Sequence, residues 1–317
     1  MDLVVIGGGF WGVAASSIAR ERGLDTLLID NADPNGASRN AAGIVCLRWY
    51  RQDTVRHMLP DTWSAEDAIH GLEWLAKHVP LARTGEQFLN ATTDSGRRYE
   101  RDCYLVSSCE AVLELVPKWR ANATRVTRVR EGWRIGVSGD GDIITPRLIV
   151  AAGTMTDNLL ASAGVRAVGV TALRGRALLL RPPQQVLHDF DVPLTVLARP
   201  YTHFTFRRWG SDLIRLGDTV ERQPRDNALV ELRAIARRYL PESTEEVGVM
   251  DGLRPVCGRF HVAEHAPGLV AATGGHRVGL ALAEPAGRRA VELALSPPRE
   301  RPDKAKSNTA RNGVVRL

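Results

Sequence analysis

The chain has 317 residues and a net charge of +6, and 44% of its residues are hydrophobic and 25% are charged. A chain of this length can bury a sizeable core and divide into two lobes. No apolar stretch approaches the roughly 20 residues that a membrane-spanning helix needs, and the N-terminus lacks the basic region of a signal peptide. We therefore predict a cytoplasmic protein with no membrane partner.

The first residues contain a dinucleotide-binding pattern. Residues 3–6 form a β-branched run suited to a buried parallel strand, and residues 13–22 have a helical composition. Between them, Gly7 permits a tight turn, Gly9 leaves room for a pyrophosphate, and Gly12 lets helix and strand pack closely. The phosphates would then face the free N–H groups at the helix N-terminus.

A second apolar strand is predicted over residues 26–29, and it ends at Asp30. The Asp30 carboxylate can accept hydrogen bonds from a ribose diol and would repel a 2′-phosphate, which disfavours NADP. NAD and FAD share this pattern, so the opening alone leaves both of them open.

A loop of small residues, GASRNAAGI at 36–44, would let backbone lie close to a flat or phosphorylated ligand. With this segment the sequence resembles the D-amino-acid oxidase and glycine oxidase superfamily of flavoproteins, in which a Gly-Ala-Ser segment ending in Ala-Ala-Gly lies beside the flavin. Residues 48–51 follow this loop, and they either rim the entrance or pack the two lobes together.

The middle of the chain supports the same resemblance. Residues 122–160 predict a β-hairpin or meander with Gly-Asp-Gly turn signals, followed by an apolar strand at 148–151 and Gly153. The resemblance implies that Val126 and its neighbours lie near the adenosine half of the cofactor.

Two segments near the end of the chain resemble the closing motifs of the same superfamily. They are DGLRPVCGRF at 251–260 and GLVAATGGHRVGLALAEPAGRRAVELAL at 268–295, in which a strand, a Gly-Gly turn and a helix over 283–295 are expected. A helix N-terminus there could stabilise negative charge on the reduced flavin. The acidic and proline signature that usually follows Arg-Pro in the family is missing after Pro255.

The remaining stretches predict a substrate lobe of antiparallel strands flanked by helices, one of them near 65–78. The expected fold class is α/β, a Rossmann-like FAD-binding domain with an inserted antiparallel-sheet (α+β) substrate domain. The predicted divisions are 1–45, 96–167 and 250–296 for the FAD-binding domain, 46–95 and 168–249 for the substrate domain, and 297–317 for a basic, disordered tail.

Arginine suits a substrate carboxylate because its planar fork forms two charge-assisted hydrogen bonds. The resemblance implies that Arg254 takes the place of the family's carboxylate-binding arginine and that Arg277 matches a second arginine near the same substrate. For each, a surface or interdomain salt bridge is the alternative. His203, with Tyr201 and Thr205, falls on a strand where the family often places a wall facing the flavin.

The full set of predicted cofactor-binding residues comes from the glycine turn, the strand end, the small-residue loop, the meander and the closing turn: Gly7, Gly9, Phe10, Trp11, Gly12, Asp30, Asn31, Ser38, Ala41, Ala42, Gly43, Val126, Ala152, Gly153, Gly274, Gly275, His276, Arg277, Val278, Gly279 and Leu280. FAD is expected to bind without a covalent bond, since the offset of Cys257 from Arg-Pro does not match the covalent relatives. The four cysteines show no zinc-like spacing, so we predict buried free thiols and no metal: Cys46, Cys103, Cys109 and Cys257.

The resemblance implies an FAD-dependent oxidation of the Cα–N bond of a glycine-type amine to an imine, which water splits into a 2-oxo acid and an amine. The substrate is either a free small amino acid or a glycine-like group on a modified base of DNA or tRNA, as in the oxidase domain of the bifunctional tRNA 5-methylaminomethyl-uridine enzyme. The tail supplies two thirds of the net positive charge, which fits a polyanion as well as a solvated terminus. An FAD monooxygenase, an NAD dehydrogenase or a non-catalytic flavin-binding protein are the alternatives, and the oligomeric state is left open.

Overall fold

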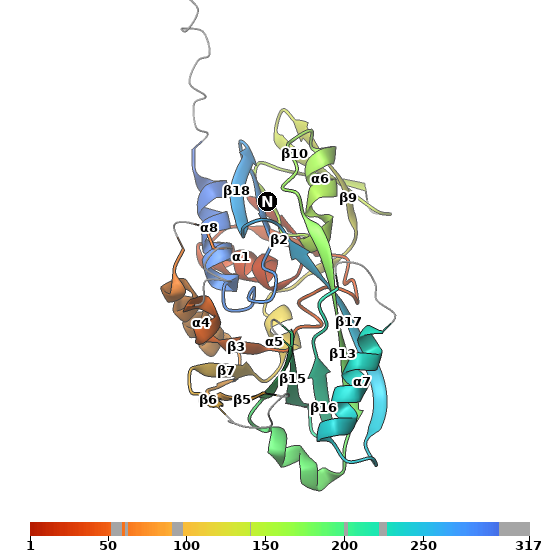
Figure 1. The fold of residues 1–317 in the computed structure, drawn as a ribbon. Helices are drawn as coiled ribbons and strands as arrows, with labels where there is room; N and C mark the ends of the chain where they lie inside the picture. Colours follow the sequence, from red (N-terminus) through yellow and green to blue (C-terminus); the bar gives the residue numbers. More distant parts are fainter. Residues whose placement is uncertain are drawn as a thin grey trace, which may run out of the picture.

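The computed structural model describes residues 1–51, 59–60, 63–90, 98–139, 141–199, 202–221 and 227–297 (Figure 1). The tail beyond residue 297 and Tyr201 lie outside these ranges. Among the helices within them, none has both the length and the apolar character needed to span a membrane.

A six-stranded sheet forms the upper half of Figure 1. Its order is β18-β19-β12-β1-β2-β8, and its neighbours are parallel except for the β18–β19 pair. The strands are β1 (Leu3–Ile6), β2 (Thr26–Asp30), β8 (Trp119–Arg120), β12 (Leu148–Val150), β18 (His261–Ala266) and β19 (Leu269–Thr273). The parallel strands β1, β12 and β19 are buried along their whole length, as expected for a sheet covered on both faces.

Alternate residues of β1 enter two different cores. Leu3 and Val5 pack with helices α1 (Phe10–Glu21) and α8 (Ala283–Leu295). Val4 and Ile6 pack with the other face, which is covered by the meander β9 (Ala123–Val129), β10 (Gly132–Val137) and β11 (Gly141–Thr145) and by α6 (Thr156–Ser162). Successive side chains of a strand point to opposite faces, so both faces of β1 are buried. The predicted strand, meander and closing helix are confirmed.

A seven-stranded, largely antiparallel sheet occupies the lower half of Figure 1, where α7 (Ala228–Tyr239) packs against it. Its order is β17-β13-β16-β15-β14-β5-β6, made of β5 (Glu86–Asn90), β6 (Arg98–Glu100), β13 (Thr171–Arg181), β14 (Leu194–Arg199), β15 (Thr202–Trp209), β16 (Leu213–Gly217) and β17 (Glu245–Val256). The long ribbon β13–β17 runs between the two halves of the molecule (Figure 1). The expected α/β fold with an inserted antiparallel sheet is thus confirmed.

A small third layer lies beside the first sheet. It contains the sheet β3-β7-β4, made of β3 (Ile44–Cys46), β4 (Leu81–Ala82) and β7 (Cys103–Val106), with the helices α2 (Leu47–Arg51), α4 (Ala65–His78) and α5 (Cys109–Leu113). Two 3-10 turns, η1 (Gly153–Met155) and η2 (Gln184–Phe190), complete the elements. Helix α4 matches the predicted range, and Ser64 and Asp67 form a capping box at its start.

We expect Gly71→Ala to lower the free energy of unfolding by about 3 kcal/mol. A Cβ at Gly71, in the middle of α4, would lie 1.6 Å from the carbonyl oxygen of Ala281. The sign of this change in stability is informative, since the replacement of glycine by alanine inside a helix normally raises stability by about 1 kcal/mol. Urea denaturation measures the change, and Glu73→Ala, on the exposed face of the same helix, should stay within about 0.5 kcal/mol of the parent. A variant as stable as the parent would contradict the contact between α4 and Ala281.

Candidate active site

A cavity of about 1060 Å³ joins the two large sheets. Its volume is at the upper end of the about 300–1,000 Å³ that small-molecule and cofactor sites occupy, which suits a long dinucleotide together with a small substrate. The predicted cofactor residues that line it are Gly7, Gly9, Phe10, Trp11, Asp30, Asn31, Ser38, Ala41, Ala42, Gly43, Ala152, Gly153, Gly274, Gly275, His276, Arg277, Val278, Gly279 and Leu280.

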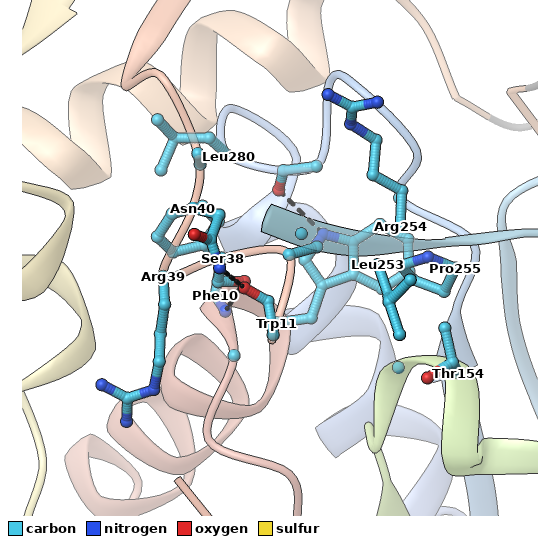
Figure 2. Close-up of a pocket in the computed structure, with 18 of the residues that line it drawn as sticks. Phe10, Trp11, Ser38, Arg39, Asn40, Thr154, Leu253, Arg254, Pro255 and Leu280 are labelled. Carbon is cyan, nitrogen blue, oxygen red and sulfur yellow. Dashed lines mark hydrogen bonds between the residues drawn. The ribbon is translucent and has the colours of Figure 1, made fainter. Parts of the chain in front are cut away.

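The glycine turn explains why the start of α1 is open to a ligand. Gly7 has φ +105°, and a Cβ there would lie 2.3 Å from the carbonyl oxygen of Ala151. Gly12 does not line the cavity, but a Cβ on it would lie 1.8 Å from the carbonyl oxygen of Gly7. Gly12 therefore holds helix against strand, as predicted, while the Phe10 N–H donates to Ser38 Oγ over 3.1 Å (Figure 2).

Asp30 stands at the end of β2 with three donors around it. The Gly8 N–H donates to Asp30 Oδ1 over 3.1 Å. Oδ2 lies 3.4 Å from Arg39 Nη2 and 3.2 Å from Arg120 Nη1. The negative charge of Asp30 is thereby compensated, so repulsion of a 2′-phosphate is not an argument against NADP in this protein. The two arginines were not foreseen, because only the fold brings the loop that carries Arg39 and the strand β8 that carries Arg120 to this strand end.

Val126 does not line the cavity. Its side chain is fully buried in the core between the first sheet and the meander, and its N–H donates to Ser162 Oγ of α6 over 2.9 Å. Residues 121–123, which lead into the same strand, line the cavity instead. The alternation along β9 turns Val126 towards the core, so the meander meets the cavity at its first residues only.

The closing turn 274–280 is fixed by side chains from two helices. Trp11 Nε1 of α1 donates to the carbonyl oxygen of Gly279 over 2.8 Å (Figure 2), and Tyr50 Oη of α2 donates to the carbonyl oxygen of Val278 over 2.8 Å. His276 has φ 46° within this turn. Of residues 48–51, Tyr50 therefore packs the layers together while Arg48 lines the cavity, and the side chains of residues 49 and 51 are outside the described ones.

Arg254 lies on β17 and is buried at the cavity wall. Its Nη2 lies 2.8 Å from Asp218 Oδ2, and its Nη1 donates to the carbonyl oxygen of Thr219 over 3.1 Å. Asp218, which also lines the cavity, pairs in addition with the fully buried Arg215 of β16. In Figure 2, the side chains of Arg254 and Arg39 extend in opposite directions. Arg39 pairs with Asp30 of the first sheet, whereas Arg254 belongs to the ribbon strand β17.

We define the arginine cluster as Arg215, Asp218, Arg254 and Arg277. Burial alone would raise the pKa of Asp218, but the three guanidinium groups outweigh it and lower this pKa to about 2. Burial and the charge of Arg254 lower the pKa of Arg277 to about 10, against the opposing effect of Asp218. The cluster therefore carries three positive charges and one negative charge at neutral pH.

Arg277 is the unsatisfied member of the arginine cluster. It lines the cavity, and within the described ranges its guanidinium has no hydrogen bond or ion pair. Burial, then Arg277 and Arg254, lower the pKa of the neighbouring His276 to about 4, so His276 is neutral at pH 7. An anion entering the cavity would find a fork with free donors at Arg277.

Arg215 and Asp218 are functional candidates that the sequence interpretation missed. The signal was the arginine within the apolar strand LIRLG, 213–217, because a charge inside a buried strand requires a partner. His203 was predicted at the site, but its side chain is not among those described, and only its backbone is placed, opposite Leu197.

All four cysteines are free thiols, as predicted. Cys46, Cys103 and Cys109 are buried and Cys257 is half-buried. The Cys257 thiol donates to the carbonyl oxygen of Arg259 over 2.8 Å, and burial raises its pKa to about 11. In the described part of the chain no cysteine lines the cavity.

We expect Gly175→Ala to weaken substrate binding without loss of cofactor. Gly175 lies across the ribbon from Gly252, and a Cβ on it would come within 2.2 to 2.3 Å of the Arg254 guanidinium atoms. The displaced arginine should raise KM about tenfold or more, since each tenfold change corresponds to about 1.4 kcal/mol. Gly248→Ala on β17, where the added methyl meets nothing within 4 Å, is the matched control. Equal KM values for both variants would contradict the position of Arg254.

Comparisons with known proteins agree with this geometry. The family model described as "DAO: FAD dependent oxidoreductase" matches residues 2–123 and 120–293. A search of curated proteins found no significant match.

Among solved structures, glycine oxidase from Geobacillus kaustophilus is 18% identical and superposes with a TM-score of 0.73 over 92% of this chain and 94% of that one. Iminodiacetate oxidase from Chelativorans sp. BNC1 is 16% identical, with a TM-score of 0.74 over 95% and 97%. L-Proline dehydrogenase from P. horikoshii is 14% identical, with a TM-score of 0.74 over 93% and 93%. At these identities the likeness establishes the fold.

Proposed function

The chain belongs to the DAO family of FAD-dependent oxidoreductases, and we propose that it oxidises the Cα–N bond of a glycine-type amine that carries a carboxylate. The observation that carries this proposal is the arginine cluster at the cavity wall, with the free donors of Arg277 beside Arg254. A glycine oxidase and an iminodiacetate oxidase among the proteins of the same fold act on substrates of this kind, as their names state.

The residues around the cavity fit FAD. The glycine turn of Gly7 and Gly9, with the open start of α1, would hold the pyrophosphate, and Asp30 would hold the ribose. The closing turn would lie near the flavin ring. FAD held there would supply a hydride acceptor for the oxidation of the substrate carbon. We propose that it binds without a covalent bond, supported by the absence of any described cysteine from the cavity lining.

The protein's own contribution is to bind the substrate carboxylate with positive charge and to add no further positive charge at His276 beside the substrate ammonium group. Arg277 would bind the substrate carboxylate through its free fork, and Arg254, held by Asp218 and Thr219, would add positive charge on the same side. The neutral His276 adds no positive charge that would repel an ammonium group. Fixing the carboxylate orients the Cα–H bond. Such alignment of the reacting atoms lowers the activation free energy by several kcal/mol.

The proposal includes two kinds of substrate, a free amine and an amine attached to a nucleobase. The two substrates differ in their expected response to salt. Binding of DNA or RNA weakens steeply with ionic strength because counterions are released, whereas a small zwitterion depends on salt only weakly. The same titration at two salt concentrations therefore separates the free substrate from the attached one.

The test begins with the absorbance spectrum of the purified protein, followed by anaerobic titration with glycine, sarcosine, D-alanine and N-glycyl-modified nucleosides. We expect flavin absorbance that one of these amines bleaches, and a 2-oxo acid in the product mixture. Protein that is colourless and fails to bind added FAD would refute the cofactor assignment. Flavin that only a reduced nicotinamide bleaches would favour the monooxygenase alternative.

A further inference from the structure

A buried carboxyl group lies behind the cavity wall, away from the arginine cluster. Glu86, the first residue of β5, has 0% of its surface exposed. Its Oε1 accepts a hydrogen bond from Thr195 Oγ1 of β14, and its Oε2 lies 3.4 Å from Cys103 Sγ of β7. An ionised carboxylate in such a place is costly, so its retention requires a reason.

Two hydroxyl groups connect Glu86 with the cavity. Thr195 Oγ1 lies 2.7 Å from Thr205 Oγ1 on the neighbouring strand β15. Thr195 and Thr205 both line the cavity, whereas Glu86 does not. Thr205 is also opposite Gly217 in the sheet, the residue before Asp218, so this chain of hydrogen bonds reaches the wall that carries the arginine cluster.

The direction of the hydrogen bonds follows from the donors that are present. A hydrogen bond with Cys46, then burial and the charge of Glu86, raise the pKa of Cys103, which therefore stays a thiol, and its S–H donates to Oε2. An ionised Glu86 accepts at Oε1 as well, so Thr195 must donate to it and accept from Thr205. The lone pairs of Thr205 Oγ1 then remain as an acceptor for a donor in the cavity.

Protonation of Glu86 reverses this order without breaking a contact. The protonated carboxyl donates to Thr195, Thr195 donates to Thr205, and the Thr205 hydroxyl points its hydrogen to the cavity. The chain thus has two complete hydrogen-bonding states that differ by one proton at Glu86.

Resting on the proposed function, we propose that Glu86 takes up, through Thr195 and Thr205, the proton that the substrate ammonium loses before oxidation. The substrate N–H bond breaks and its proton moves to Thr205 Oγ1. Thr205 passes its own proton to Thr195, and Thr195 passes its own to Glu86 Oε1. The ammonium becomes a neutral amine with its electron pair retained, and the carboxylate becomes a carboxylic acid. The proton returns to water by the same route after the product leaves.

The groups that face Glu86 set its affinity for a proton. Burial raises its pKa, while hydrogen bonds from Thr195, Cys103 and Cys46 and the charge of Arg48 lower it. Cys46 ends β3 and Arg48 belongs to α2, so four elements besides β5 surround the carboxyl. Burial is the larger effect, so the pKa of Glu86 lies above its ordinary value, and its carboxylate accepts a proton more readily than an exposed glutamate does.

The first test is the pH dependence of anaerobic flavin reduction by saturating amine. In Glu86→Gln the rate constant should fall about tenfold per pH unit below the pKa of the bound amine, because only amine that is already neutral reacts. The parent should stay level until the pH falls below the pKa of Glu86 itself, where the proton acceptor is already occupied. Thr195→Val and Thr205→Val should each behave as Glu86→Gln does, and Thr145→Val, a buried threonine outside the cavity, should behave as the parent. Identical pH profiles for the parent and these variants would overturn the proposal.

The second test needs no turnover. In the FAD-loaded protein, the infrared band of a protonated carboxyl that is present in the parent and missing in Glu86→Gln should change with pH between about 5 and 9. A band that never appears, or never changes, would show that Glu86 cannot take up a proton. If no amine reduces the flavin of the parent while this band titrates, the proposed function fails, whereas the ability of Glu86 to take up a proton is shown separately.

Discussion

Arg254→Met should lose about a thousandfold in kcat/KM while FAD remains bound, which corresponds to about 4 kcal/mol. Arg254 lies at the cavity wall with Asp218 and Thr219 as partners, and the glycine turn that would hold the cofactor belongs to the other sheet. The loss should therefore concern the substrate alone. Anaerobic flavin reduction and the bound-flavin absorbance, measured on the same sample, separate the two effects.

A suitable control for this variant is Arg174→Met. Arg174 lies on the adjacent strand β13 and pairs with Asp251, outside the cavity. The substitution Arg174→Met makes the same change of charge and side-chain size as Arg254→Met, but at a partly exposed site. If both variants lost activity equally, the effect would come from the general charge of the protein, and the special role of Arg254 would be refuted.

Asp218→Asn should lower the free energy of unfolding by about 3 kcal/mol, since it leaves Arg215, Arg254 and Arg277 without their carboxylate. The change should also remove one pH-dependent contribution. Because the folded-state pKa of Asp218 is lowered from 3.8 to about 2, its contribution of about 2 kcal/mol is present above pH 3.8 and is lost as the pH falls towards 2. The stability difference between parent and variant should thus shrink over that window.

Urea denaturation at several pH values from about 2 to 6 measures this difference. Asp212→Asn, which removes an exposed carboxylate paired with Arg181, should change stability by at most about 0.5 kcal/mol at every pH. The same Asp218 variant should bind acetate more tightly than the parent, because the net positive charge of the cluster increases. A stability difference that is constant from pH 6 to 2 would contradict the lowered pKa of Asp218.

The parts of the fold that could be predicted depend on local patterns. The glycine turn, the buried strands β1 and β2 and the capped helix α4 are each specified by residues close together in the sequence. The likeness to a known flavoprotein superfamily then indicated how these parts are assembled, and the family match agrees with it. The domain divisions stay a prediction, and the ribbon strand β17 crosses the proposed boundary at residue 250.

The parts that could not be predicted depend on the register between distant strands. Asp218 meets Arg254 because β16 and β17 both pair with β13, and Glu86 meets Thr195 because β5 pairs with β14. The side chain of Val126 faces the core for the same reason, since a shift of one residue changes the face of a strand. Arg39 and Arg120 reach Asp30 from a loop and a neighbouring strand, which no spacing in the sequence reveals.

The strand order of the first sheet also determines when the protein can acquire its cofactor during biosynthesis. The strand β1 is synthesised before the strands beside it, since its partner β12 begins at residue 148 and the next strand, β19, only at residue 269. The closing turn follows β19, and a hydrogen bond between residues 268 positions apart joins it to Trp11. A nascent chain therefore has an incomplete cofactor cradle until residue 280 has been synthesised.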